Sequence, residues 1–252
     1  MRNIELYGNE YINNNPFEDI QVMYRRKKIL EILAQEKITE GRTILEIGCG
    51  LEPLFLFYPH YTKYVVVEPC DVFFRNAQSL VSEKGIKHID LYHDFFENKE
   101  IQLSKYEFDY ILCSGLLHEV ESPEIILKSI FNICTKDKTV VHINVPNMKS
   151  FHRLLAKESG LIKDEHDKSQ NNIVKQQHTN FDMTILVEMV EKTGFDIIES
   201  GSYFIKPFTH AQMKELMEIN ILTPEILDGL YNMEKYMPDL GSEIFVNVMR
   251  KK

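Results

Sequence analysis

The sequence predicts an α/β fold, a doubly wound sheet of seven strands with helices on both faces. Short apolar runs alternate with helical patterns between residues 41 and 145, which is typical of a parallel sheet. The first run ends in a glycine turn, I-L-E-I-G-C-G-L-E-P over residues 44–53, and the second run ends on Glu68. A strand, a glycine turn, a helix and a strand tipped with a carboxylate form a nucleoside-binding half-site in Rossmann-like sheets.

The individual elements follow from local signals. Residues 1–16 are polar and contain N-N-N-P at 13–16, which predicts a loose arm before a helix over residues 17–35. Apolar runs and helical spacing then predict strands at 43–47, 64–68, 89–92, 108–113 and 139–145, with helices near 71–83 and 123–134.

The second half of the chain is expected to close the sheet. A helix at 148–159 and a polar stretch at 160–177 precede a helix at 182–193, for which Gly194 is a suitable C-terminal cap. Strands at 195–202 and 243–249 would form an antiparallel pair. The residues between these strands are too many for a hairpin turn and predict a helical appendage, with helices near 209–219 and 223–236. We therefore expect one domain over 1–252, divided into an arm and helix (1–40), a ligand-binding core (41–145) and a closing part (146–252) with a helical insertion at 203–241.

Composition narrows the function. The chain has 252 residues, of which 44% are hydrophobic, enough for a sizeable core. Its net charge of −9 argues against nucleic acid as a partner. No apolar run approaches the roughly 20 residues that span a bilayer, and the first ten residues lack an apolar signal core. Four cysteines without C-x-x-C spacing predict reduced thiols in a cytoplasmic protein, with neither disulfides nor a metal.

The glycine turn also indicates which cofactor it holds. Gly48 and Gly50 can adopt backbone angles closed to other residues, and their missing side chains leave room for a ligand. A dinucleotide fold would have a third glycine where Pro53 stands, and Glu52 would repel a pyrophosphate. S-adenosylmethionine (SAM) has no phosphate, and its cationic groups tolerate a nearby acid such as Glu46. The alternatives are a nicotinamide dinucleotide (NAD) and a turn without any ligand.

The order of motifs resembles the class I SAM-dependent methyltransferases over nearly the whole chain. The glycine turn, the acid Glu68, the segment H-D-F at 93–95 and the segment G-L-L-H-E-V at 115–120 follow one another as in that family. Leu51 departs from the family, many members of which have a third glycine there. The resemblance implies SAM as cofactor, S-adenosylhomocysteine as product, and ribose and adenine contacts from Glu68 and Asp94. The predicted cofactor contacts are Arg25, Glu46, Gly48, Cys49, Gly50, Glu68, Pro69, Asp94, Phe95, Cys113 and Ser114.

His118 is the candidate general base. It follows the fourth predicted strand, on the edge where open α/β sheets bind ligands, and histidine suits proton abstraction near neutral pH. Alternatively His118 only lines the pocket or caps a helix. Its neighbour Glu119 is expected to be a solvated or helix-start acid, and the alternative is that it reaches the substrate. Arg25 is expected to reach the cofactor carboxylate unless it belongs to a charged outer helix face.

A second group of polar residues predicts the substrate site. These residues follow the fifth and sixth predicted strands and the polar stretch. The basic ones among them would form a cationic entrance to the cavity, called here the cationic mouth, that binds a phosphate or carboxylate. The alternative is that they are solvated residues scattered over the surface. The set is Asn147, Arg153, His178, Tyr203, Lys206 and His210. These segments resemble bacterial small-molecule methyltransferases of surface-polysaccharide pathways. The predicted activity is therefore methyl transfer to a small polar acceptor, an oxygen nucleophile on a phosphorylated or nucleotide-linked precursor, by a monomer or homodimer with no membrane partner. The alternatives are a SAM-binding regulatory module and an NAD-dependent oxidoreductase.

Overall fold

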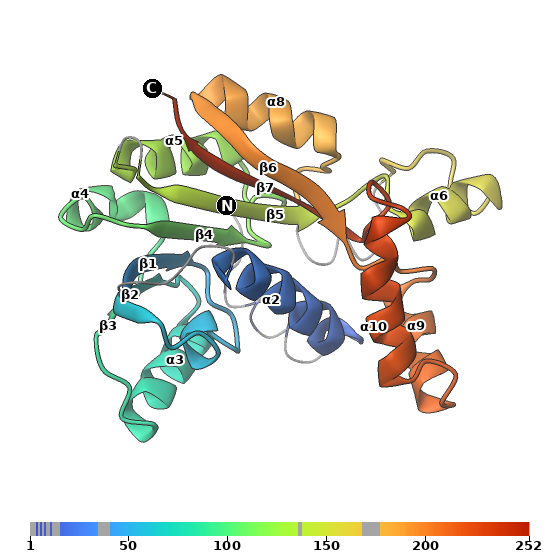
Figure 1. Ribbon diagram of the computed structural model, residues 1–252, viewed down its shortest axis with the longest axis horizontal. Helices are drawn as coiled ribbons and strands as arrows, with labels where there is room; N and C mark the ends of the chain where they lie inside the picture. The colour runs from blue at the N-terminus through green and yellow to red at the C-terminus, as the bar shows by residue number, and fades with distance from the viewer. Residues whose placement is uncertain are drawn as a thin grey trace.

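The computed structural model describes residues 4, 6, 8, 11, 16–34, 41–135, 138–167 and 177–251. Within these residues seven strands form one sheet in the order β3-β2-β1-β4-β5-β7-β6 (Figure 1). Only β7 runs antiparallel to its neighbours β5 and β6. The predicted fold class is thus confirmed. The strands are β1 (Arg42–Ile47), β2 (Tyr61–Val67), β3 (Ile89–Tyr92), β4 (Tyr110–Ser114), β5 (Val140–Pro146), β6 (Phe195–Tyr203) and β7 (Glu243–Arg250).

Helices cover both faces of this sheet because successive side chains of a buried strand point to opposite sides. Leu45 and Ile111 belong to the cluster packed against α5 (Pro123–Ile133) and α8 (Met183–Thr193). Their neighbours Ile44 and Leu112 belong to the opposite cluster, which includes residues of α2 (Glu18–Ala34) and α3 (Asp71–Glu83). In Figure 1, α5 and α8 lie above the sheet and α2 and α3 lie below it.

The predicted appendage consists of α9 (His210–Glu218), α10 (Pro224–Asn232) and a 3-10 turn (Met233–Lys235). A third buried cluster joins it to α2. In this cluster Tyr24 stacks on Phe204 with ring centroids 4.5 Å apart and on Tyr231 at 5.2 Å. The appendage therefore packs beside α2 at the end of the sheet (Figure 1).

Most predicted boundaries agree with the structure, and the differences have local causes. Gly194 ends α8 with φ of +107°, as its capping role requires. The helix predicted from residue 148 is α6 (Phe151–Glu158), which begins later because the Asn147 side chain holds the preceding turn by accepting from the Lys149 N–H at 2.9 Å. The arm residues 13–15 and residues 168–176 of the polar stretch lie outside the described residues.

Candidate active site

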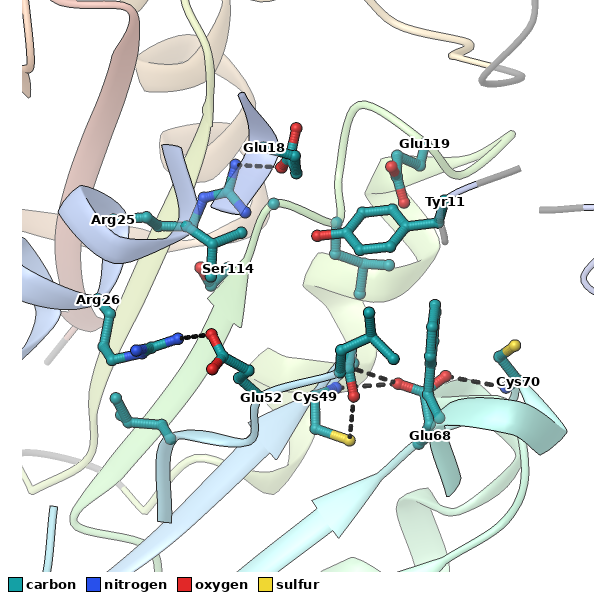
Figure 2. A pocket seen from close by; sticks show the side chains of 18 of the residues that line it. Tyr11, Glu18, Arg25, Arg26, Cys49, Glu52, Glu68, Cys70, Ser114 and Glu119 are labelled. Atoms are coloured by element: carbon teal, nitrogen blue, oxygen red, sulfur yellow. Dashed lines mark hydrogen bonds and ion pairs between the residues drawn. The ribbon is translucent and has the colours of Figure 1, made fainter. Parts of the chain in front are cut away.

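A cavity of about 590 Å³ lies at the carboxyl ends of β1, β2 and β4. The strand order reverses between β1 and β4, which is where open α/β sheets bind ligands. Figure 2 shows two opposite walls of this cavity. The glycine-turn wall contains Cys49, Glu68 and Cys70, and the Tyr11 wall contains Tyr11, Glu18 and Glu119.

The turn after β1 needs glycine for its backbone conformation. Gly48 has φ of +76° and Gly50 has φ of +57°, in the left-handed region that other residues rarely adopt. A Cβ built at either position would meet no described atom within 4 Å. The space beside both glycines is therefore open, as a ligand lying against the main chain requires.

Glu68 holds this turn against the start of α3. Its carboxylate accepts from the backbone N–H of Cys49 at 2.9 Å, of Gly50 at 3.4 Å and of Cys70 at 2.8 Å. Burial raises the pKa of Glu68, and these backbone N–H groups offset part of that effect. Two carboxylate oxygens offer about four acceptor positions, so Glu68 keeps capacity for a ligand hydroxyl.

Glu46 lies on β1, two residues before Gly48, and also lines the cavity. It accepts from the Leu54 N–H at 3.1 Å and from the Tyr64 hydroxyl at 2.9 Å. Burial raises the pKa of Glu46 to about 8, so its protonated form predominates at neutral pH.

Two arginines of α2 complete the wall beside β4. Arg25 Nε donates to both oxygens of Glu243 at 3.0 Å, and its guanidinium lies against the turn at Gly115. Arg26 pairs with Glu52 at 2.5 Å (Figure 2). The charge of Glu52 is therefore paired with a residue of α2, and the sequence pattern did not indicate this ion pair.

Comparison with known proteins agrees with this architecture. Residues 20–200 match the family model described as a methyltransferase domain. The chain belongs to this methyltransferase family. The predicted resemblance to class I SAM-dependent methyltransferases is confirmed.

Individual relatives are more distant. The thiol S-methyltransferase TMT1B of Rattus norvegicus is 29% identical over 105 residues, covering 40% of this chain and 43% of the rat protein. The match thus spans less than half the length of this curated relative. Among solved structures, the plantazolicin methyltransferase BamL has a TM-score of 0.59 at 13% identity, with 99% of this chain and 96% of BamL covered. Phosphoethanolamine N-methyltransferase 2 of Haemonchus contortus also has a TM-score of 0.59, at 14% identity, with 98% and 57% covered. At these identities the solved structures show a shared fold.

The methyltransferase cavity brings together most of the predicted cofactor residues. Besides the glycine turn and Glu68, Pro69 and Ser114 line it. Among the described residues no group of three His, Cys, Asp or Glu side chains could hold a metal ion. In the same part of the chain, no helix is long and apolar enough to cross a membrane.

Three predicted cofactor residues are absent from the described cavity wall. Cys113 is fully buried in the core between β4 and α5. Asp94 and Phe95 follow β3, and the Asp94 carboxylate accepts from the Phe95 N–H and from Asn98, both at 2.8 Å. Hydrogen bonds from Asn98 and Lys99 lower the pKa of Asp94 to about 2. An adenine contact from this strand end stays a prediction.

His118 is not among the described lining residues, whereas its neighbour Glu119 is. The imidazole is buried with 6% of its surface exposed, and its Nε2 lies 3.7 Å from Glu119 Oε1. The His118 carbonyl accepts from the His178 N–H at 2.9 Å, so the structure joins these two predicted residues through the main chain.

The predicted substrate residues do not line the cavity in the described part of the chain. The Asn147 amide donates to the carbonyls of Asp239 and Gly241 at 3.0 Å, and the Tyr203 hydroxyl donates to Glu243. Both side chains therefore hold neighbouring segments of the fold together.

The predicted cationic residues likewise lie outside the described cavity wall. Arg153 donates to the carbonyls of Glu165 and Asp167, both at 2.6 Å. Lys206 is buried, with 5% of its surface exposed. His210 begins α9 and lies 4.0 Å from Glu18, so it approaches the Tyr11 wall from behind. A cationic mouth over the cavity is not formed by these residues.

Several lining residues escaped prediction. Tyr11 packs edge-on against Phe73 with ring centroids 5.6 Å apart, although it lies in the segment predicted as a loose arm. A Cβ on Gly8 would lie only 2.7 Å from the Cys70 sulfur, so this part of the arm packs closely on the start of α3. Glu18 and Lys214 carried no motif that separates them from ordinary surface charges.

Proposed function

We propose that SAM binds across this cavity with its ribose at Glu68 and its carboxylate toward Arg25. The acceptor then enters along the Tyr11 wall. One observation carries the proposal: a single cavity contains the open glycine turn, a buried carboxylate with acceptor capacity, and an arginine of α2 beside the turn after β4. These groups suit the ribose, sulfonium and amino-acid parts of SAM, and the described residues of the wall form no glycine-rich phosphate cradle of the dinucleotide type.

The chain's own residues have to orient the two reactants. SAM supplies a methyl group bonded to a sulfonium sulfur, and transfer is an in-line displacement. The acceptor must therefore lie about 3 Å from the methyl carbon on the side opposite the sulfur. Tyr11 and Glu119 stand on the wall that faces the glycine turn (Figure 2), which places them to hold the acceptor and to exclude water.

Glu119 connects the predicted base to the cavity. It is buried, with 8% of its surface exposed, and approaches His118 to 3.7 Å. We propose that Glu119 contacts the acceptor and that His118 acts through it. A proton released by the acceptor would pass to the carboxylate that faces it, while the imidazole behind sets the charge of that carboxylate.

The charge of the cavity bears on the acceptor class. Its described lining includes six acids and three bases, and five acids remain once the protonated Glu46 is set aside. Arg25 and Arg26 are already paired with acids. An acidic wall repels phosphate and attracts cations. We propose a small acceptor whose reacting end is neutral or positively charged, such as an amine, a thiol or an alcohol. The phosphorylated polysaccharide precursor stays a prediction, since it relied on a cationic mouth built from Arg153 and Lys206.

Binding and transfer are tested separately. Calorimetry should detect S-adenosylhomocysteine binding to the wild type, with weaker binding to Glu68→Ala and unchanged binding to Glu83→Ala, an exposed acid on α3. Transfer of labelled methyl should then be compared for amines, thiols and alcohols and for their phosphorylated counterparts. Consistent preference for the phosphorylated counterparts would refute the proposed acceptor class. Tight cofactor binding without transfer to any acceptor would favour a regulatory module, and binding of NAD would favour an oxidoreductase.

A further inference from the structure

Glu243, the first residue of β7, is a buried carboxylate that lies far along the sequence from the glycine turn and Glu68. Only 2% of its surface is exposed. It accepts from Gln21 Nε2 at 3.0 Å and from Asn144 Nδ2 at 2.6 Å, and also from the Tyr203 hydroxyl. Burying a carboxylate is costly unless it is paired and hydrogen-bonded, so this network is what allows a charge at this position.

The charged partner of Glu243 is Arg25, 218 residues earlier in the chain. Burial alone would raise the pKa of Glu243. The charge of Arg25, its hydrogen bonds and those from Tyr203 and Gln21 outweigh burial and hold that pKa below its usual value. Both side chains therefore stay ionised inside the fold.

The orientation of Arg25 leaves a second edge of the guanidinium toward the cavity. The edge formed by Nε and Nη2 donates to Glu243, and Nη2 also lies 3.6 Å from Glu18. The third nitrogen, Nη1, faces the turn after β4, where a Cβ on Gly115 would lie 3.4 Å from it. Arginine has five N–H donors in a rigid planar arrangement, so a group held at one edge can bind a second carboxylate at another.

Fixing Arg25 in advance removes an entropic cost of ligand binding. A mobile arginine loses side-chain freedom when it is ordered. Here Glu243 is anchored by Gln21 on α2, Asn144 on β5 and Tyr203 on β6, so the guanidinium is ordered before any ligand arrives.

We infer that Glu243 is a positioning residue for cofactor binding, which orients Arg25 so that its free edge receives the carboxylate of the amino-acid part of the cofactor. This inference depends on the proposed binding of SAM in the cavity. Glu243 itself lies behind Arg25 and acts on the cofactor only through it.

The test compares two ligands that differ in the carboxylate. S-adenosylhomocysteine carries the amino-acid part, and 5′-methylthioadenosine lacks it. We expect Glu243→Gln to weaken S-adenosylhomocysteine binding roughly tenfold, equivalent to about 1.4 kcal/mol, and to change 5′-methylthioadenosine binding less than about twofold. Combining Glu243→Gln with Arg25→Ala should weaken binding no further than Arg25→Ala alone, because the two residues act in series.

Three results would overturn the inference. Equal weakening of both ligands would show that Glu243 only maintains the fold. Unchanged or tighter binding of S-adenosylhomocysteine to Glu243→Gln would show that Glu243 merely reduces the charge of Arg25. If Glu243→Gln does not fold, Tyr203→Phe takes its place, because it removes one hydrogen bond to Glu243. We expect Tyr203→Phe to weaken S-adenosylhomocysteine binding about twofold to fivefold and 5′-methylthioadenosine binding less. Equal weakening of both ligands in Tyr203→Phe would be the third overturning result. A wild type that binds neither ligand would instead refute the proposed cofactor site.

Discussion

Glu46 offers a quantitative test of the electrostatics of the cavity through protein stability. Its side chain is buried on β1 and accepts from the Leu54 N–H and the Tyr64 hydroxyl. Burial raises the pKa of Glu46 to about 8 from an ordinary value of 4.5. The perturbation is Glu46→Gln, which keeps the shape of the protonated carboxyl and a carbonyl oxygen for both donors but cannot ionise.

The sign of the effect follows from proton binding. Between pH 4.5 and 8 the folded protein holds a proton on Glu46 that the unfolded chain has released. Its contribution to the free energy of unfolding is therefore fully present below pH 4.5 and is lost as the pH rises through 8. The loss is about 1.4 kcal/mol per pH unit, so it amounts to about 2–3 kcal/mol between pH 5 and 7.

The assay is urea unfolding of both proteins at pH 5, 6, 7 and 8, with the free energy of unfolding taken from the midpoint and slope. Other titrating groups contribute equally to both proteins and cancel in the difference. We expect the advantage of Glu46→Gln over wild type to grow by about 2–3 kcal/mol from pH 5 to pH 7. Glu83→Gln, on the exposed end of α3, controls for the substitution itself. A difference between wild type and Glu46→Gln that does not vary with pH would refute the reasoning.

Further predictions concern the cavity. Glu68→Ala should lower the affinity for S-adenosylhomocysteine roughly tenfold or more, since a hydrogen bond to a charged group is worth about 1.5–3 kcal/mol, and unchanged calorimetric affinity would contradict the ribose contact. Gly115→Ala should lower the free energy of unfolding, measured with urea, by about 1–2 kcal/mol, because residue 115 has φ of +64°. The added Cβ would contact Arg25, so steady-state kinetics should show a higher KM for SAM. Glu119→Gln should lower kcat by roughly 10²–10⁴-fold with little change in SAM affinity, because Glu119 is the group proposed to take the proton, and a fully active variant would refute that role. His118→Ala should lower kcat less, because His118 acts through Glu119, and a fully active His118→Ala would remove His118 from the mechanism.

Local signals explain why the elements could be predicted from the sequence. The predicted helix 71–83 and strand 89–92 coincide with α3 and β3, because apolar spacing and flanking turn residues operate over a few neighbours. Gly194 ends α8 for the same kind of reason, since a left-handed cap depends on one residue's backbone. Before α6 the predicted boundary is displaced at Asn147, whose side chain also donates to the carbonyls of Asp239 and Gly241, and such long-range contacts leave no local pattern.

The glycine side of the cavity was predictable and the opposite side was not. Gly48, Gly50 and Glu68 come from adjacent strands joined by one helical connection, so their proximity follows from sequence order. Tyr11 reaches the cavity, and Glu243 reaches Arg25 behind the cavity wall, through packing between distant segments, and neither residue carries a local signal.

Sheet order also explains why the predicted cationic mouth is not formed. Lys206 follows β6 and was expected over the cavity with other residues that follow strand ends. Because β7 is inserted between β5 and β6, β6 lies three strand positions from β4. At about 4.8 Å per strand this is a lateral displacement of roughly 14 Å. A residue that directly follows β6, such as Lys206, is therefore not brought to the cavity by the shared sheet edge alone.

The family model matches residues 20–200, and some residues that line the cavity lie outside this span. Residues 20–200 contain the glycine turn, Glu68 and Glu119. Tyr11 and Glu18 precede that span, and Lys214 follows it, yet all three line the cavity. Family membership accordingly accounts for methyl transfer and for the sheet edge that supports it. If Tyr11, as proposed, and Lys214 contact the acceptor, exchanging either residue should alter acceptor preference more than cofactor affinity.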